Sequence, residues 1–328
     1  MRPIRLILAL VVAAGLGPSL WVRSPVPEEP DRARPVLTRI TIEPAHAGPF
    51  RLDAAWRITG EGRFFGGFSA LAAASSKQII AASDTGYRLV IDLASDGRTA
   101  TASYDRFGAD SDAAKVAYDL ESLTRDPATG NLWGAYEGSN GIRRFGPDLR
   151  PLQFETIPAM RGWGDNSGAE AFTRLPDGKF FAIEERAKAW GSNEHRALLF
   201  PGDPLLGAQP RKLFVGVPGN FRPVDAIAID HTRLLILLRD VAFGFPPRFE
   251  TAIAFLDLAA ASEGLDAEIV AHLGEGFPHD NYEGMAITDD ADGRFLWLIS
   301  DDNGMTYQNS YLLRLRWPDE RKRQKARE

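Results

Sequence analysis

One short pattern recurs five times along the chain and restricts the fold more than any other feature of the sequence. Each copy has a polar residue that opens a short apolar strand, then a turn, then a second apolar strand that ends in acidic residues. The opening residues lie 52, 49, 55 and 58 positions apart and are Ser69, Glu121, Glu170, Asp225 and Glu283. A period of about 50 residues, with three or four short strands in each unit, is typical of a β-propeller.

The last copy shows the pattern most clearly. Glu283 opens an apolar run at residues 285–287, a turn containing Gly293 follows, and a second apolar run at residues 295–299 ends in Asp301 and Asp302. The start of the first strand and the end of the second lie at the same end of a hairpin. We therefore expect the opening and closing acids of every unit to meet at one face of the propeller.

The ends of the repeat region predict how the ring closes. The last unit stops near Trp317 without a fourth strand, and two strand candidates at residues 36–42 and 50–59 precede the first unit. Pairing the N-terminal strands into the last blade would close the ring and remove two exposed sheet edges. The sequence thus predicts an all-β propeller of five blades, whose N-terminal and C-terminal strands share a blade. A sixth blade, built from the N-terminal strands and residues 99–118, is the alternative.

The remaining segments are short. Arg2 and Arg5 precede an apolar run at residues 6–17, which predicts that residues 1–24 form a signal peptide or a retained membrane anchor. Residues 25–35 are proline-rich and charged, as in a linker, and residues 318–328 form a charged tail around the propeller domain at 36–317. We expect an exported protein that is periplasmic or anchored to the outer side of the inner membrane. The protein would then contact the membrane only through residues 1–24, if this segment is not cleaved.

Composition narrows the class of partner. The net charge is −6, and no basic cluster suggests binding to nucleic acid. The chain has no cysteine, which excludes disulfide bonds and acylation as a lipoprotein. The sequence has no G-x-S-x-G elbow, Walker loop, H-E-x-x-H motif or dinucleotide fingerprint. We expect a monomer that binds a cation or a small anionic substrate.

The acids at the two ends of each hairpin are candidate metal ligands. A group of carboxylates at one mouth would repel one another unless a cation bound between them or some of them held protons. Carboxylate oxygens without cysteine favour a hard cation, and Ca²⁺ is the cofactor that we expect. The candidate ligands are Asp84, Glu121, Glu137, Glu170, Glu185, Asp225 and Asp302. The structural alternative is that such repeated acids accept hydrogen bonds from the neighbouring blade and fix its register.

Catalytic and substrate-binding residues are expected near the same mouth. Glu283 and Asp301 are the candidate catalytic acids, and His279, on the loop before the last unit, is a candidate general base. Arg88, Arg186 and Arg239 lie close to the closing acids and could bind an anionic substrate. Pairing with adjacent carboxylates is the structural alternative for these arginines, and solvation on a loop is the alternative for the histidine.

Several of these motifs together resemble the bacterial phytase-like family, whose members are named for esterase-like activity of phytase. The matching segments are DLESL at residues 119–123, GAEAF at 168–172, NYEGMA at 281–286, SD at 83–84 and SDDN at 300–303. The resemblance covers roughly residues 36–317, although Ser69 and Asp225 replace glutamate in the first and fourth units. It implies a propeller, export and Ca²⁺-assisted hydrolysis of a phosphoester.

Two functions follow from the sequence. The first is an exported, Ca²⁺-assisted phosphoester or ester hydrolase with a carboxylate-lined site at one mouth of the channel. The second is a non-catalytic periplasmic propeller that binds a ligand or partner, in which the acids are structural. Replacing Glu283 by glutamine distinguishes the two, because only the first predicts a loss of activity without a loss of stability.

Overall fold

The computed structural model describes residues 34–62, 64–94, 99–107, 119–164, 167–242, 244, 246–260 and 265–318. Residues 1–24, most of the 25–35 segment and residues 319–328 lie outside these ranges, so the expectations of an export segment, a linker and a charged tail remain predictions. Within the described part of the chain, no helix has the length and the apolar character needed to cross a membrane.

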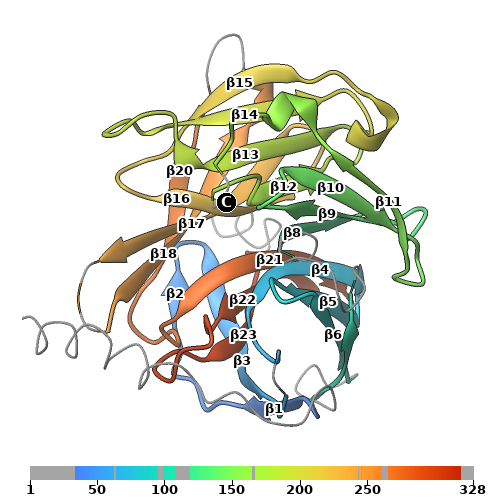
Figure 1. Ribbon diagram of the computed structural model, residues 1–328. Helices are drawn as coiled ribbons and strands as arrows, with labels where there is room; N and C mark the ends of the chain where they lie inside the picture. The colour runs from blue at the N-terminus through green and yellow to red at the C-terminus, as the bar shows by residue number, and fades with distance from the viewer. Residues whose placement is uncertain are drawn as a thin grey trace, which may run out of the picture.

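Strands dominate the described residues and form five sheets (Figure 1). The first blade contains β4 (Phe68–Ser75), β5 (Gln78–Ser83), β6 (Tyr87–Leu93) and β7 (Ala100–Arg106). The second contains β8 (Leu120–Arg125), β9 (Leu132–Tyr136), β10 (Gly141–Phe145) and β11 (Pro151–Thr156). The third contains β12 (Ala171–Arg174), β13 (Phe180–Ala187), β14 (Glu194–Phe200), β15 (Arg211–Gly216) and β19 (Leu265–Asp266).

The last two blades follow the same plan. The fourth contains β16 (Arg222–Ala228), β17 (Arg233–Ala242), β18 (Arg248–Asp257) and β20 (Glu268–Leu273). The fifth contains β21 (Asn281–Asp290), β22 (Gly293–Asp301), β23 (Ser310–Arg316), β3 (Phe50–Thr59), β1 (Val36–Arg39) and β2 (His46–Ala47). Among the described residues, single turns of 3-10 helix connect strands at η2 (Pro158–Met160), η3 (Pro204–Leu206) and η4 (Leu258–Ala260).

The fifth blade joins the two ends of the chain. The N-terminal strand β3 pairs with the C-terminal strand β23, and β1 adds to its outer edge. Figure 1 shows the blue N-terminal strands beside the red C-terminal ones. The shared blade and the count of five are therefore confirmed. The described residues form no sixth blade, because residues 100–106 pair as β7 at the outer edge of the first blade.

The innermost strands β4, β8, β12, β16 and β21 contact one another in sequence around the centre of the ring. The hydrophobic core lies between blades, and each of its five buried clusters is shared by two adjacent blades. One of them packs Trp56 and Trp297 of the fifth blade against Phe68 and Ile79 of the first. Because both faces of the inner part of a blade are covered in this way, strands such as β5 and β9 are buried on both sides, whereas outer strands such as β7 alternate between half-buried and exposed positions.

Candidate functional site

A β-bulge at the start of the innermost strand recurs around the ring. In four blades the bulged residue is the polar residue that opens the sequence repeat. Ser69, Glu121 and Glu283 are each skipped by the pairing of the flanking residues, and Glu170 lies in the same position just before β12. A bulge leaves the extra residue out of the ladder and turns its side chain in a new direction. The bulge is thus the local device that turns these acids towards the channel mouth.

An acid at or near the end of the second strand pairs with the residue two positions before the bulge. The backbone N–H groups of Asp84 and Glu137 donate to the carbonyls of Gly67 and Asp119, and Asp301 pairs with Asn281. Glu185 takes the same place in the third blade, where its N–H donates to Gly168. The pairing therefore selects Glu185 over Glu184 and Asp301 over Asp302 as the closing acids at the mouth.

The fourth blade departs from the sequence alignment by one residue. Its bulge falls at Val224, since Pro223 pairs with Leu238 and Asp225 pairs with Leu237. The closing position is then Arg239, which pairs with Arg222, and not Asp240. One blade thus brings two guanidinium groups to the mouth where the others bring carboxylates.

These positions enclose a cavity of about 310 Å³ at the mouth of the channel. Seven carboxylates and two guanidinium groups line it together with Asn303. The carboxylates are those of Asp84, Glu121, Glu137, Glu170, Glu185, Glu283 and Asp301, and the guanidinium groups are those of Arg222 and Arg239. Five of the seven predicted metal ligands and both predicted catalytic acids are therefore brought together. We refer to this site as the acidic cavity.

Arg239 lies among the acids and neutralises part of their charge. Its guanidinium donates to Glu283 over a short contact, to the Asn281 side chain at 3.1 Å and to Glu185 at 3.0 Å. Its side chain is only 17% exposed. Although burial opposes its charge, the carboxylates of Glu283, Glu170 and Glu185 raise the pKa of Arg239 above its usual value. Arg239 is therefore a fixed, permanently charged part of the cavity.

Glu283 and Asp301 are neighbouring carboxyl groups in the lining of the acidic cavity, and each affects the pKa of the other. Burial raises the pKa of Glu283, whereas Arg239 and Asn281 lower it, and the net change is upward. Burial and the neighbouring charges of Glu283 and Asp84 raise the pKa of Asp301 well above its usual value. Raised pKa values favour the protonated form of both groups, so the pair is suited to giving up and taking back a proton.

A second group of acids lies on the second blade. Oxygen atoms of Asp119, Glu121 and Glu137 all lie within 4.8 Å of one another. Burial and the charges of Glu283, Asp84, Glu137 and Asp119 raise the pKa of Glu121 well above its usual value. Glu170 behaves alike, because burial and Glu185 outweigh the opposing effect of Arg239 on its pKa. Arg239 lowers the pKa of Glu170 and of Glu283, whereas every effect on Glu121 raises its pKa, so the acids of the second blade are the ones that lack a compensating cation.

Asp225 lies elsewhere, inside the channel wall. It is 1% exposed and accepts hydrogen bonds from the N–H of Met285 at 2.6 Å, the N–H of Ala226 at 2.8 Å and the hydroxyl of Ser122 at 2.9 Å. These donors come from the fifth, fourth and second blades. Burial raises the pKa of Asp225 despite them. Asp225 therefore links three blades through hydrogen bonds and is not a member of the acidic cavity.

Asp302, Arg88 and Arg186 also lie outside the lining of the acidic cavity. Asp302 accepts a hydrogen bond from Ser310 at 2.8 Å and from backbone N–H groups, which engages both of its oxygens. Arg88 donates to Asp105 and to a backbone carbonyl within the first blade. Arg186 is largely exposed and lies 3.7 Å from Glu184. These three side chains therefore pair with nearby groups of the protein, which is the structural role given above as the alternative to ligand binding.

His279 is not brought together with Glu283 and Asp301. It is exposed and lines a separate cavity with Arg248 and Tyr307. Three residues separate it from Glu283 in sequence, and it lies against the β17–β18 hairpin. The placement of His279 therefore gives it no contact with the acidic cavity.

Sequence reasoning missed two members of the site. Arg222 was hidden because the repeat was aligned on Asp225, although its position two residues before a bulge is shared by Asp119 and Asn281. Asp119 was visible as the first residue of the D-L-E segment, and its spacing of two from Glu121 is the signal that could have identified it. The bulge at Glu121 lets both side chains lie at the same mouth, where their carboxylate oxygens are within 4.8 Å of each other.

Comparisons with known proteins identify a family for most of the chain. The sequence matches the family described as phytase-like, esterase-like activity of phytase, over residues 63–304. No curated protein matches the chain. Among solved structures, the hydrazine synthase of Kuenenia stuttgartiensis is similar with 11% identity and a TM-score of 0.39, over 71% of this chain and 55% of that chain. The chain thus spans about half the length of that protein.

Proposed function

The chain belongs to the phytase-like family, and from this premise we propose that its acidic cavity hydrolyses a phosphoester or ester bond in a small anionic substrate with the help of bound Ca²⁺. The observation that supports this proposal is the imbalance of charge in the cavity. Seven carboxylates face only two guanidinium groups in a space of about 310 Å³. Such a site demands a counter-cation or bound protons.

The donor set fits Ca²⁺. The lining offers carboxylate and amide oxygens, which are the ligands that this ion prefers. Asp84, Glu121 and Glu137 with the adjoining Asp119 would hold it, because they lie on the side where Arg239 does not neutralise the charge. When bound, Ca²⁺ supplies positive charge that neutralises these oxygens and polarises a phosphoryl or carbonyl oxygen of a substrate.

The Glu283–Asp301 pair is suited to acid–base chemistry. The pKa values of both groups are raised, so a proton is retained on the pair at a higher pH than on an isolated carboxyl. One carboxyl can accept a proton from an attacking water while the other holds a proton for a leaving group. Arg239 and Asn281 fix the position of Glu283 through their hydrogen bonds to its Oε1 atom.

Arg222 is suited to orient an anionic substrate. Its side chain is 59% exposed, and its contacts to Glu185 are long, at 3.4 Å. A guanidinium held so loosely at the rim keeps most of its donors available for a phosphate or carboxylate. Arg239 is already engaged by three side chains, so Arg222 replaces Arg88 and Arg186 as the candidate that meets the substrate.

Hydrolysis is tested with purified protein and two chromogenic substrates, p-nitrophenyl phosphate and p-nitrophenyl acetate. Each is assayed with Ca²⁺ and with a chelator. We expect Ca²⁺-dependent release of nitrophenol, which Glu283→Gln reduces by about 10²–10⁴-fold while the melting temperature stays within a few degrees of the wild type. Glu155→Gln, the same change at an exposed position on β11, is the matched control and should leave turnover unchanged.

Two results would contradict the proposal. One is no turnover of either substrate together with no change in melting temperature on adding Ca²⁺. The other is unfolding of the Glu283→Gln variant with normal turnover in the fraction that remains folded. The second result would favour the non-catalytic binding propeller, in which Glu283 and Arg239 serve to hold the blades together.

We propose export on the strength of the sequence of residues 1–24 alone. Expression of the full chain followed by separation of periplasm, membrane and cytoplasm tests it. Recovery in the periplasm without residues 1–24 indicates a cleaved signal, and recovery in the membrane with an intact N-terminus indicates an anchor. Recovery of the intact chain in the cytoplasm contradicts export.

A further inference from the structure

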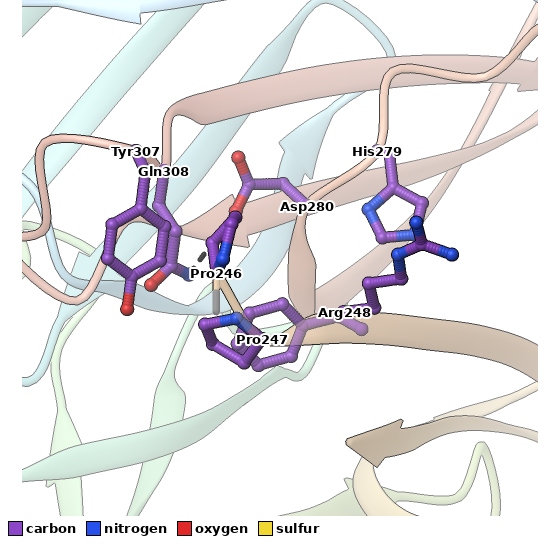
Figure 2. Close-up of a pocket in the computed structure, with 8 residues that line it drawn as sticks. Pro246, Pro247, Arg248, His279, Asp280, Tyr307 and Gln308 are labelled. Atoms are coloured by element: carbon purple, nitrogen blue, oxygen red, sulfur yellow. Dashed lines mark hydrogen bonds between the residues drawn. The ribbon is translucent and has the colours of Figure 1, made fainter. Parts of the chain in front are cut away.

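A second cavity, of about 300 Å³, lies at the edge of the fourth and fifth blades and takes no part in the proposed hydrolysis (Figure 2). Three segments enclose it. The β17–β18 hairpin contributes Pro246, Pro247, Arg248 and Phe249, the segment before β21 contributes His279 and Asp280, and the segment before β23 contributes Tyr307 and Gln308. We call it the hairpin cavity.

The hairpin cavity exists because the fourth blade extends past the ring. β17 runs on for three residues after Arg239, and these pair with the start of β18 as far as Ala242 opposite Arg248. The two strands therefore rise above the mouth and present Pro246 to Phe249 to the loops of the fifth blade. The cavity has the volume of a small-ligand site and is bounded by paired strands on one side.

One side of the hairpin cavity is basic. Figure 2 shows the side chains of Arg248 and His279 reaching the same side of the cavity. Among the described residues, no ion pair includes Arg248 or His279. A guanidinium offers five N–H donors in a fixed fork that matches a carboxylate, and an imidazole adds one more donor. These groups are available to bind an anion.

The acid in the lining is already committed to the protein. Asp280 is buried and accepts hydrogen bonds from the N–H of Asn281 at 2.9 Å, the N–H of Asn309 at 2.7 Å and the side-chain amide of Gln308 at 3.3 Å. Its role is to hold the two loops of the fifth blade together. Gln308 also donates to the backbone carbonyl of Asp301, so its side chain links the hairpin cavity to a residue of the acidic cavity.

The other side of the hairpin cavity is built of rings. In Figure 2, Tyr307 lies opposite Arg248 and His279, with Pro246 and Pro247 between the two sides. Phe249 completes the lining. Proline and aromatic rings are rigid apolar surfaces against which a planar group packs at little entropic cost. A cationic side and a side built of rings suit a ligand that carries an anionic group at one end and an apolar, planar group at the other.

We propose that the hairpin cavity binds a small organic acid, whose carboxylate is held by Arg248 and His279 and whose ring or chain packs against Pro247, Phe249 and Tyr307. The site is independent of the proposed hydrolysis, because none of these residues lines the acidic cavity. It gives the fourth blade a function that the sequence repeat does not account for.

Isothermal titration calorimetry of the full protein with benzoate tests the proposal, with benzamide and inorganic phosphate as comparison ligands. We expect saturable binding of benzoate and much weaker binding of the neutral benzamide and of phosphate, which lacks the ring. Arg248→Met should weaken benzoate binding by about tenfold or more, as expected for loss of a charged hydrogen bond. Phe249→Ala should also weaken it while leaving any phosphate binding unchanged.

Arg57→Met is the matched control, since Arg57 is an exposed arginine on β3, away from the hairpin. It should bind benzoate as the wild type does. Arg248 is exposed, so its replacement should not change the melting temperature. The proposal is wrong if benzoate does not bind, if phosphate binds as tightly as benzoate, or if Arg248→Met and Arg57→Met bind it equally.

Discussion

Replacing Arg239 by glutamine is the sharpest test of the charge balance in the acidic cavity. The guanidinium contacts Glu283 and Glu185 directly and lowers the pKa of Glu170. Removing one partner from a buried ion pair leaves an uncompensated charge and destabilises a protein by about 3–5 kcal/mol. We therefore expect Arg239→Gln to lower the free energy of unfolding by about 3 kcal/mol or more in metal-free buffer near neutral pH.

The same substitution should make the loss depend on pH. Without the guanidinium, the pKa values of Glu283 and Glu170 move further above those of the unfolded chain. A carboxyl whose pKa rises on folding contributes stability below its unfolded pKa, and this stability is lost as the pH rises through the folded value. The variant should thus be closer to the wild type at about pH 5 than at about pH 8.

Urea unfolding of both proteins at the two pH values, with chelator present, measures these differences. The control is Arg233→Gln on the same strand, where an exposed pair with Asp230 should be worth less than about 1 kcal/mol. A loss for Arg239→Gln no larger than for the control would refute the reasoning. A loss of equal size at both pH values would refute the assignment of raised pKa values to Arg239's neighbours.

Three further predictions concern the ion and the ring. Because burial and neighbouring charges raise the pKa values of Glu121 and Asp301, Ca²⁺ should raise the melting temperature more at about pH 8 than at about pH 5.5, and an equal shift at both would contradict a carboxylate site. Asp225→Asn should lower the free energy of unfolding, measured with urea, by about 2–4 kcal/mol, because an asparagine amide cannot accept hydrogen bonds from all three groups that donate to Asp225. A stability equal to that of the wild type would show that these hydrogen bonds do not hold the blades together. Gly284→Ala should lower the free energy of unfolding by about 1–3 kcal/mol in the same assay, because a Cβ at this position would lie 2.9 Å from the backbone nitrogen of Leu71 in the adjacent blade. An unchanged stability would show that the two inner strands can move apart to make room for it.

The sequence alone was sufficient for the architecture. Five apolar hairpins of similar length and spacing cannot bury both of their faces except against one another, so the period predicted a ring of blades. The spare strands before the first hairpin and the missing strand after the last predicted closure between β3 and β23. The convergence of Glu121, Glu283 and Asp301 on one mouth also followed, because the first strand of a hairpin starts where the second ends and the repeat places these ends alike in each blade.

The tertiary structure alone decided which residues of the fourth blade reach that mouth. The alignment of the repeat placed Asp225 there, whereas the bulge at Val224 places Arg239 there and leaves Asp225 buried among hydrogen-bond donors from three blades. Side chains on a strand alternate between its faces, so a shift of one residue reverses the direction of each. A bulge has no strong sequence signal when the bulged residue is apolar and the next one is acidic. The repeat therefore determined which end of each blade carries charged side chains at the mouth. The pairing of the strands determined that in the fourth blade these charges are positive.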